Sequence, residues 1–510
     1  GGTIQDAAGN NATLTLATPG AAGSLGANKA LVIDGIAPTT TSVNVPANGT
    51  YTTSQNLDFT VNFNENITVN TTGGTPQIAV TIGSTVRQAV YSSGSGSTAL
   101  VFRYTVQSGD LDTDGITIGT LAANGGTLQD TASNDADLTL NSVGTTTNVF
   151  VGNPTITWTG ASNNDWNVAS NWDTSSVPNS AANVVVPSGI VNYPTISSPV
   201  TVNSINIASG ASLIANAAVT AEVTYNRNLP TTNWYLVSAP VSGESQQDII
   251  ANHNFATGSG ANIGLGAFQN NTGAPWTYAN NTSTGSIVPG YGVSMKLASP
   301  GDVSITGNLI TTNYGLPITT GTRNNFNLLG NPYTCYINSA AIAANPSNSA
   351  INNATFWLWD GTQYVTYNNA NPIEIAPAQG FFVEANTDDN IIFFTTIQSH
   401  QNTDTFMRNT SKSSLELFVE SDDKKTSTKV FYIDGKTTGF DSGYDSKMFG
   451  DVNYDFAVFT ELVTDNEGEH LAIQTLSNSA YETTVIPVGV IAEANKEISF
   501  SASSQNLPNG

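Results

Sequence analysis

Alternation of hydrophobic and polar residues is the dominant pattern in this sequence. In residues 57–69, LDFTVNFNENITV, apolar and polar side chains alternate over the length of a strand. A similar run, ALVFRYTVQSGD at residues 99–110, ends in turn-forming residues. A period of two residues is typical of strands that bury one face. The best helical stretch, INSAAIAANPS at residues 337–347, is short. We therefore expect an all-β protein.

Part of the sequence is repeated. Residues 1–16, GGTIQDAAGNNATLTL, align without a gap with residues 125–140, GGTLQDTASNDADLTL. Self-similarity of this kind indicates an array of similar domains. We interpret residues 1–35 as the end of a preceding repeat and residues 36–152 as one repeat. About seven short strands in that repeat predict an immunoglobulin-like β-sandwich. On this interpretation the chain is a window cut from a longer repetitive protein.

Three further segments are predicted from changes in pattern and composition. Residues 153–225 contain short apolar runs between Ser-Gly and Asn-Ala turns, which predicts a β-solenoid-like or small β-sheet segment. Residues 226–400 contain two related phrases, NWYLVSAPV and FNLLGNPYT, and we expect a β-sandwich with two related halves. Eight of the 14 Lys and Arg residues follow residue 400. Residues 401–510 are therefore predicted to form a C-terminal β-sandwich, truncated at its end.

Composition and charge exclude several classes of function. The chain has 14 Lys and Arg against 38 Asp and Glu, a net charge of −24. Nucleic-acid binding requires a basic surface, so no nucleic-acid partner is expected. No apolar run approaches the roughly 20 residues of a membrane-spanning helix, so no direct membrane insertion is expected. Cys335 is the single cysteine, which leaves no internal disulfide and fits a bacterial surface protein.

The strongest candidate for a ligand site is DLDTDG, residues 110–115. Alternating carboxylates followed by a turn-forming glycine supply the hard oxygen ligands that Ca²⁺ takes. The loop is not an EF-hand, because Leu121 stands where the bidentate glutamate would be. The alternative is a solvated acidic turn stabilised by Asx hydrogen bonds.

Four phrases resemble a known family. LVIDGIAPT, NFNENITV, YTVQSGDLDTDGI and GGTLQDTASNDADLTL are similar to the bacterial immunoglobulin-like repeats of giant surface adhesins, over residues 1–152. The resemblance implies tandem rods that hold a binding tip away from a cell, with Ca²⁺ at domain ends and linkers. Carried onto this sequence, it implies as metal ligands Glu65, Asp112, Asp114, Asp130 and Asp34. A bound ion would remove repulsion between carboxylates at a junction and stiffen the rod.

A second resemblance covers residues 153–510. WTGASNNDWNVASNW, NWYLVSAPV, FNLLGNPY, APAQGFFVEA and TTGFDSGYDSKMFG resemble the C-terminal regions of large proteins exported by the type IX secretion system of Bacteroidota. It implies the type IX secretion machinery as a partner and a location at the outer face of the outer membrane. The expected role is surface attachment or gliding-type motility, with a surface glycan or another cell-surface molecule as the target.

Trp357 and Trp359 are the candidate ligand-binding residues. They alternate within FWLWDGTQYVTY and so share one face of a strand, where exposed rings stack against sugars. The alternative is that both rings belong to a core, as Trp mostly does. Exposed rings would favour a second function, the carbohydrate-binding region of a secreted polysaccharide-degrading protein.

Catalysis has little support in the sequence. The histidines His253, His400 and His470 lie far apart in unrelated contexts, and no HExxH, GxSxG or Walker motif occurs. We therefore expect a non-enzymatic protein. A hydrolase of unrecognised type is the remaining alternative, and a cleft that holds two close carboxylates would support it.

Overall fold

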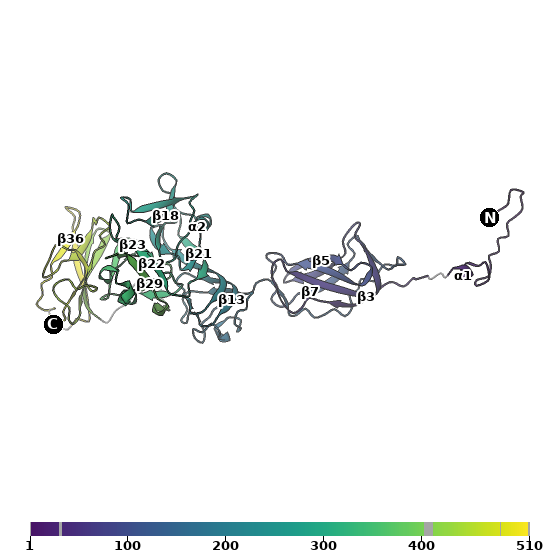
Figure 1. The fold of residues 1–510 in the computed structure, drawn as a ribbon, viewed down its shortest axis with the longest axis horizontal. Helices are drawn as coiled ribbons and strands as arrows, with labels where there is room; N and C mark the ends of the chain where they lie inside the picture. Colours follow the sequence, from purple (N-terminus) through teal and green to yellow (C-terminus); the bar gives the residue numbers. More distant parts are fainter. Residues whose placement is uncertain (1, 30–32, 402–411, 480, 508–510) are drawn as a thin grey trace. The chain divides into compact units, whose positions relative to one another are not determined.

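The computed structural model describes residues 2–29, 33–401, 412–479 and 481–507 (Figure 1). The chain divides into two compact units, Gly1–Pro154 and Thr155–Gly510, and each is described by itself. Strands make up almost all of the regular structure in both. The prediction of an all-β protein built of β-sandwich domains is confirmed. Among the described residues, no helix is long and apolar enough to cross a membrane.

The first unit is built around strand β3 (Asn56–Asn70). Its alternate side chains point inward, and Leu57, Phe59 and Val61 are fully buried, as a period of two predicts. The sheet runs in the order β1-β3-β6-β5-β4-β7, with β8 also on β3, while β2 pairs with β9. The other elements are α1 (Leu25–Asn28), β1 (Thr40–Asn44), β2 (Gly49–Tyr51), β4 (Gln77–Ile82), β5 (Thr85–Ser93), β6 (Ser97–Thr105), β7 (Thr117–Ala122), β8 (Thr127–Gln129) and β9 (Val149–Val151).

The second unit begins with strands in parallel. Consecutive strands β10, β11, β13 and β15 pair in parallel, and so do β12 and β14. Strand β15 then pairs antiparallel with β21, so this segment shares a sheet with the part that follows. The β-solenoid-like character of residues 153–225 remains a prediction. The bounds are β10 (Thr155–Thr157), η1 (Ala169–Asn171), β11 (Asn183–Val186), β12 (Thr195–Ile196), β13 (Val200–Ile207), β14 (Ile214–Ala215), β15 (Val219–Leu229), β17 (Val241–Ser242) and β21 (Gly301–Leu309).

The three tryptophans at the start of this unit form part of its core. Trp158, Trp166 and Trp172 are each at most 2% exposed. The ring centroids of Trp158 and Trp172 are 4.9 Å apart, and those of Trp166 and Trp172 are 4.7 Å apart, both in edge-on contact. Buried edge-on aromatic pairs of this kind stabilise a core. These rings therefore hold the parallel strands together.

Two four-stranded sheets with the same strand order follow, one after the other along the chain. Sheet A has the order β16-β20-β18-β19 and sheet B the order β23-β28-β25-β26, and every pairing in both is antiparallel. In each, the last strand in sequence inserts between the first and second. The bounds in sheet A are β16 (Tyr235–Ser238), β18 (Asn262–Phe268), β19 (Trp276–Asn280) and β20 (Gly292–Met295), and in sheet B they are β23 (Phe326–Gly330), β25 (Phe356–Trp359), β26 (Tyr364–Tyr367) and β28 (Gly380–Glu384).

Short elements connect the strands of the two sheets. A capped helix follows the first strand in each case: Ser245 caps α2 and Asn338 caps α3, each accepting a hydrogen bond from a first-turn amide. The connecting elements are α2 (Gln246–Asn252), β22 (Tyr314–Ile318), β24 (Tyr336–Asn338), α3 (Ser339–Ala344), η2 (Pro346–Asn348), η3 (Asn352–Ala354), β27 (Glu374–Ile375), β29 (Asp389–Phe393), η4 (Thr395–Ile397) and β30 (Gln398–Ser399).

The C-terminal sheet completes the second unit and packs on sheet B. Phe449, which is 2% exposed, joins an aromatic cluster with Phe326, Trp357 and Phe382 of sheet B. The sheet order is β36-β34-β35-β32-β31-β37, with β33 on β35. The bounds are β31 (Ser413–Ser421), β32 (Lys424–Tyr432), β33 (Ser446–Lys447), β34 (Ala457–Thr460), β35 (Leu471–Leu476), β36 (Val488–Ile491) and β37 (Ser499–Gln505).

Candidate metal centre

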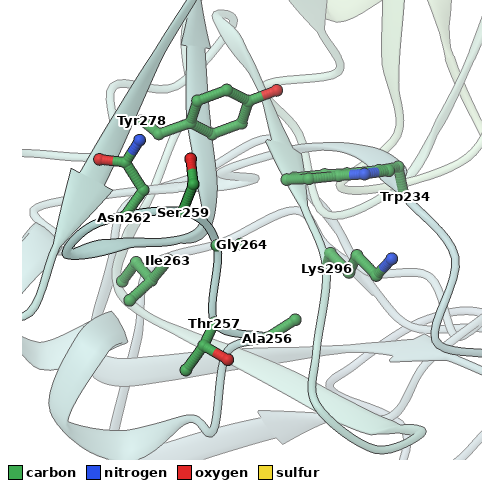
Figure 2. A pocket seen from close by; sticks show the side chains of 10 residues that line it. Trp234, Ala256, Thr257, Ser259, Asn262, Ile263, Gly264, Tyr278 and Lys296 are labelled. Atoms are coloured by element: carbon green, nitrogen blue, oxygen red, sulfur yellow. The ribbon is translucent and has the colours of Figure 1, made fainter.

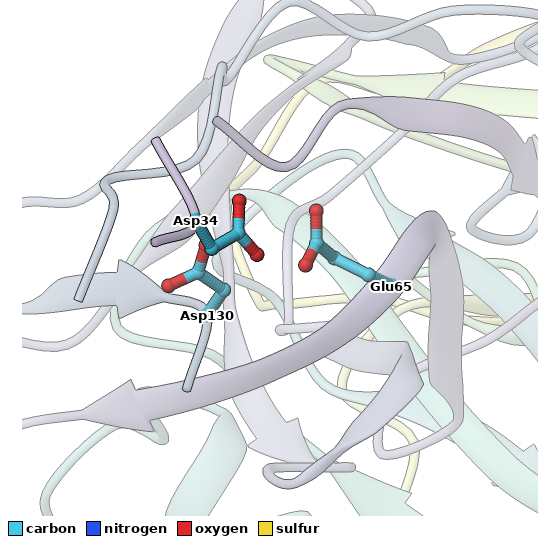
Figure 3. Close-up of side chains that lie close together, drawn as sticks. All are labelled: Asp34, Glu65 and Asp130. Atoms are coloured by element: carbon cyan, nitrogen blue, oxygen red, sulfur yellow. The ribbon is translucent and has the colours of Figure 1, made fainter. Parts of the chain in front are cut away.

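Three carboxylates from distant parts of the sequence meet in the first unit. Asp34, Glu65 and Asp130 each offer one carboxylate oxygen, and these oxygens all lie within 4.8 Å of one another. Figure 3 shows Glu65 pointing from strand β3 toward Asp34 and Asp130. Among the residues that the structure describes, this is the one group of three His, Cys, Asp or Glu side chains with such spacing.

The backbone of β3 is irregular where Glu65 lies. The pairing of β3 with β6 shifts register between Asn62 and Ile67, so Glu65 falls within an irregular stretch of the ladder. Such irregularities redirect side chains. Its neighbour Asn64 exchanges hydrogen bonds with Thr39: the Thr39 amide donates to Asn64 Oδ1 at 2.8 Å, and the Asn64 amide donates to the Thr39 carbonyl at 3.0 Å. These bonds fix β3 to the chain that follows the linker.

A tight turn positions Asp130. Its Oδ1 accepts hydrogen bonds from the amides of Ala132 at 2.7 Å and Asn134 at 2.9 Å, and its Oδ2 accepts from Asn134 Nδ2 at 2.7 Å. Asn134 Nδ2 also donates to the carbonyl of Asp34 at 3.1 Å. One asparagine side chain therefore ties the linker carrying Asp34 to the turn carrying Asp130.

The two partners of Asp34 in this cluster differ in their pKa shifts. Burial is the main cause of a raised pKa at Glu65, and the charges of Asp34 and Asp130 raise it further. Burial also acts to raise the pKa of Asp130, but the hydrogen bonds from Asn134 and the turn amides outweigh it and lower that pKa. A cation bound between the three carboxylates would relieve the repulsion that Asp34 and Asp130 exert on Glu65.

The donor set fits a hard cation. Three carboxylates carry six oxygens, and Ca²⁺ takes six to eight oxygen ligands, from carboxylates, carbonyls or water. The Asp130 oxygens retain acceptor capacity beyond the hydrogen bonds they already accept. Asp34 is exposed, Glu65 half-buried and Asp130 buried, so one side of the cluster is open to an ion from solution.

Asp112 and Asp114, the other two predicted ligands, are not part of this cluster. Asp112 is buried, and its carboxylate accepts hydrogen bonds from the amides of Gly83 and Gly115, both at 2.7 Å. Its backbone pairs with Val151, next to the end of the unit. Asp114 is exposed. The structure thus brings together three of the five predicted ligands and places the other two on a separate loop.

Asp110, the first carboxylate of the same loop, is held by internal partners. It forms an ion pair with Arg87 at 2.6 Å and accepts hydrogen bonds from the Tyr104 hydroxyl at 2.5 Å and the Gln107 amide at 2.8 Å. Burial acts to raise the pKa of Asp110, but the bonds from Tyr104, Gln107 and Arg87 outweigh it and lower that pKa. This loop is therefore braced by hydrogen bonds from within the sandwich.

The turn that positions Asp130 occurs a second time, in the first residues of the chain. Asp6 Oδ1 accepts from the amides of Ala8 at 3.0 Å and Asn10 at 2.9 Å, and Asp6 Oδ2 accepts from Asn10 Nδ2 at 3.0 Å. The backbone bridge between Gln5 and Asn11 matches the bridge between Gln129 and Asp135. The sequence repeat is therefore also a structural repeat, down to individual hydrogen bonds.

The tryptophans predicted to bind ligand are only partly accessible. Trp357 is 3% exposed, lies in the aromatic cluster around Phe449 and donates its indole N–H to the Lys447 carbonyl at 3.2 Å. Its ring is therefore not free to stack on a sugar. Trp359 is half-buried and donates its indole N–H to the Trp234 carbonyl at 2.9 Å. It lines a cavity of about 420 Å³ between sheet B and the C-terminal sheet.

No protein-family model, curated protein or solved structure matches this chain.

Proposed function

We propose that this chain is a non-enzymatic segment of a large secreted cell-surface adhesin, in which residues 36–152 serve as a stalk repeat. Calcium bound by Asp34, Glu65 and Asp130 would join the repeat to the linker that precedes it. The observation that carries the proposal is the origin of the three carboxylates: one lies in the linker and two lie in the sandwich. An ion that all three share would connect the two.

The balance of charges in the cluster favours a bound cation. Without a cation, the three carboxylates repel one another: burial is the main cause of the raised pKa of Glu65, and the charges of Asp34 and Asp130 raise it further. The exposed linker is then held mainly by neutral hydrogen bonds, such as the one from Asn134 to the Asp34 carbonyl. A divalent ion replaces repulsion by attraction and fixes Asp34 against the sandwich. A rod of such repeats would be stiff with Ca²⁺ and pliable without it.

The second unit would carry the attachment function, and the proposal assigns no catalytic role to it. The three histidines are engaged separately: His253 between the Ile249 carbonyl and the Ser304 amide, His400 between two hydroxyls, and His470 stacked on Phe459 at 3.6 Å. By resemblance, we propose export by the type IX machinery to the outer face of the outer membrane. The role there would be surface attachment or gliding-type motility.

Calorimetric melting of the full chain with Ca²⁺ or with a chelator tests the proposal. A ligand at 100 times its Kd stabilises a native protein by about 2.7 kcal/mol, so the transition of the first unit should move to higher temperature with Ca²⁺. Glu65→Gln removes both a ligand and the repulsion. This variant should therefore melt higher than the natural chain in chelator, yet lose the response to Ca²⁺.

The chain supplies a matched control for this experiment. Asp6→Asn changes the same turn as Asp130→Asn, but Asp6 lies outside the carboxylate cluster. Only Asp130→Asn should weaken calcium binding in titration calorimetry. Because the pKa of Glu65 is raised, protons should compete with Ca²⁺, and affinity should fall as the solution is acidified from neutral pH. An equal calcium response in Glu65→Gln and the natural chain would refute the proposed site.

A further inference from the structure

Sheet A carries a pocket on its surface that none of the predicted site residues lines. Its volume is about 190 Å³, and its walls include Trp234, Tyr278, Lys296, Asn262 and Thr257. Figure 2 shows Trp234 and Lys296 on one side of the opening, with Asn262 and Thr257 across from them. The volume lies below the roughly 300–1,000 Å³ of sites for drug-sized ligands. The pocket therefore suits a single terminal residue of a larger molecule.

Two accessible aromatic rings form one wall of the pocket. The centroids of Trp234 and Tyr278 are 5.6 Å apart and the rings are inclined by 47°. Tyr278 is 37% exposed and Trp234 is half-buried, in contrast to Trp158, Trp166 and Trp172 in the core. Aromatic rings that stay partly exposed beside a concave surface offer flat apolar contact to a ligand.

Lys296 is the one charged residue among the ten that line the pocket. Its Nζ lies 5.9 Å from the centroid of the Trp234 ring. Among the described residues, no carboxylate lies within ion-pair distance of Lys296. Lys296 is half-buried, in a chain with a net charge of −24. Its charge is available to an anionic ligand.

Glycines let the strands come close enough to shape this pocket. A Cβ on Gly264 would lie 2.2 Å from the Lys296 carbonyl oxygen, and a Cβ on Gly266 would lie 3.0 Å from the Tyr278 ring. Neither position tolerates a side chain without movement of its neighbours. The two glycines therefore place strand β18 directly beneath Lys296 and Tyr278.

We propose that this pocket binds a terminal sugar residue with a negatively charged substituent, either a carboxylate or a sulfate. The apolar face of the sugar ring would lie on Trp234 and Tyr278, and its anionic group would pair with Lys296. Asn262 and Thr257 supply polar side chains for the hydroxyl groups. The inference deepens the proposed attachment role, on which it rests, by naming the chemical class of the target.

The larger cavity beside Trp359 fits an anionic ligand less well. Its walls include both Glu416 and Lys429, whose charged atoms are 3.7 Å apart. Its lysine is therefore already paired with a carboxylate, whereas Lys296 is not. The indole N–H of Trp359 is also already used, in the bond to the Trp234 carbonyl. For these reasons we assign the sugar to the pocket of sheet A.

The test measures binding of three trisaccharides to the full chain, by titration calorimetry and saturation-transfer NMR. One ends in glucuronate, one in galactose 6-sulfate and one in neutral galactose. The charged sugars should bind at least ten times more tightly than the neutral one, and added salt should reduce that preference. Preference for glucuronate identifies a uronate as the natural group, and preference for the sulfated sugar identifies a sulfate. Equal or absent binding of all three overturns the proposal.

Two variants and one control locate the site. Lys296→Gln should lower affinity for the charged sugars about tenfold and leave the neutral sugar unchanged, whereas Trp234→Ala should abolish binding of all three. Lys436→Gln is the matched control, because Lys436 also lies over an aromatic ring, with Nζ 3.2 Å from the Tyr444 centroid, but lines neither pocket described here. Unchanged sugar affinity in Lys296→Gln, with an unchanged melting temperature, would place the binding elsewhere.

Failure of this inference is distinguishable from failure of the proposed stalk. Glu65→Gln should leave sugar binding intact, and Lys296→Gln should leave the calcium response intact, because the residues lie in different units. A chain that responds to Ca²⁺ but binds no charged sugar keeps the stalk and loses the ligand. A chain that binds the sugar without a calcium response keeps the pocket and loses the ion-stiffened junction.

Discussion

Sheets A and B share one strand order but use equivalent faces differently. The phrases IVPGYGVSMK (residues 287–296) and IAPAQGFFVE (residues 375–384) align, so Ser294 of β20 corresponds to Phe382 of β28. Across the ladder, Ser294 pairs with Gly266 and Phe382 pairs with Trp357. Gly266 and Trp357 are therefore equivalent positions, one without a side chain and one with the largest.

The two sheets are also covered differently around these positions. In sheet B, Trp357 and Phe382 fill the face, and Phe449, in the loop between β33 and β34, lies 4.8 Å from the Phe382 ring and 5.8 Å from the Trp357 ring. In sheet A, Leu236 and Phe268 join the same cluster, and the pocket opens farther along the strands, where Gly264 and Lys296 line it. The aligned residue to Lys296 is Glu384, which in sheet B accepts a hydrogen bond from Asn352 at 2.8 Å. One scaffold is thus filled by large rings in sheet B and keeps a pocket in part of sheet A.

The most disruptive test of this comparison is Phe449→Ala. The ring lies 4.2 Å from Tyr364 and 4.6 Å from Phe326, centroid to centroid, and is 2% exposed. Truncation of a buried phenylalanine costs about 3–5 kcal/mol, because it leaves a cavity in the cluster that covers sheet B. Urea unfolding followed by tryptophan fluorescence measures the loss.

Trp234→Ala is the matched variant from sheet A. Trp234 is half-buried and lines an open pocket, so its removal creates little new cavity and should cost clearly less than Phe449→Ala. Equal losses in the two variants would mean that both faces contribute alike to stability. The contrast between a packing face and a binding face would then fail.

The second prediction uses pH, because a histidine ties the half that contains sheet B to the parallel strands. His400 lies between the hydroxyls of Thr195, 2.9 Å from Nε2, and Ser212, 2.8 Å from Nδ1, and burial lowers its pKa to about 4. Between pH 6.5 and 4 the unfolded chain binds this proton and the folded chain does not. Stability should therefore fall as the solution is acidified through that range, by on the order of 3 kcal/mol in total.

His400→Gln isolates this contribution from other titrating groups. Asp445 works in the opposite direction: burial raises its pKa to about 7, so its contribution weakens stability as pH rises from 4 to 7. The difference between the natural chain and His400→Gln cancels Asp445. That difference, from urea unfolding at pH 7 and pH 4.5, should shrink on acidification. A pH-independent difference would show that the histidine does not titrate as described.

Local patterns made much of the fold predictable. Alternation placed the strands of the first unit. The turn-forming pair Asp360-Gly361 lies between β25 and β26, which form the antiparallel hairpin that such a pair favours. The phrases NWYLVSAPV and FNLLGNPYT fall on β16 and β23, the first strands of sheets A and B. The parallel pairings were not predictable, because partner choice between strands depends on contacts distant in sequence.

The sites were less predictable, for reasons that particular residues make clear. An alternating acidic loop looks the same whether its oxygens accept backbone amides, as Asp112 does, or face solvent, as Asp114 does. The burial of Trp357 depends on Phe449, far along the chain. Sequence reasoning missed the pocket of sheet A altogether. The sequence feature that points to the pocket is the alignment of IVPGYGVSMK with IAPAQGFFVE, in which Lys296 corresponds to Glu384. Neither phrase is informative without that alignment.

The smallest effect is expected for Gly266→Ala, which adds a methyl group at the position that Trp357 occupies in sheet B. The added Cβ would lie 2.7 Å from Ser294 Oγ and 3.0 Å from the Tyr278 ring, so the ring must shift into the pocket. Overpacking costs about 1–3 kcal/mol, and the lower backbone entropy of alanine returns about 0.4–1 kcal/mol. A net loss of about 1–2 kcal/mol is expected, together with weaker binding of the charged sugars. The same substitution in a Tyr278→Ala background should cost less, because the contact with the ring is gone and only the contact with Ser294 Oγ remains. If the cost is unchanged without the ring, the contact between Gly266 and Tyr278 does not shape the pocket, and the glycine has another role.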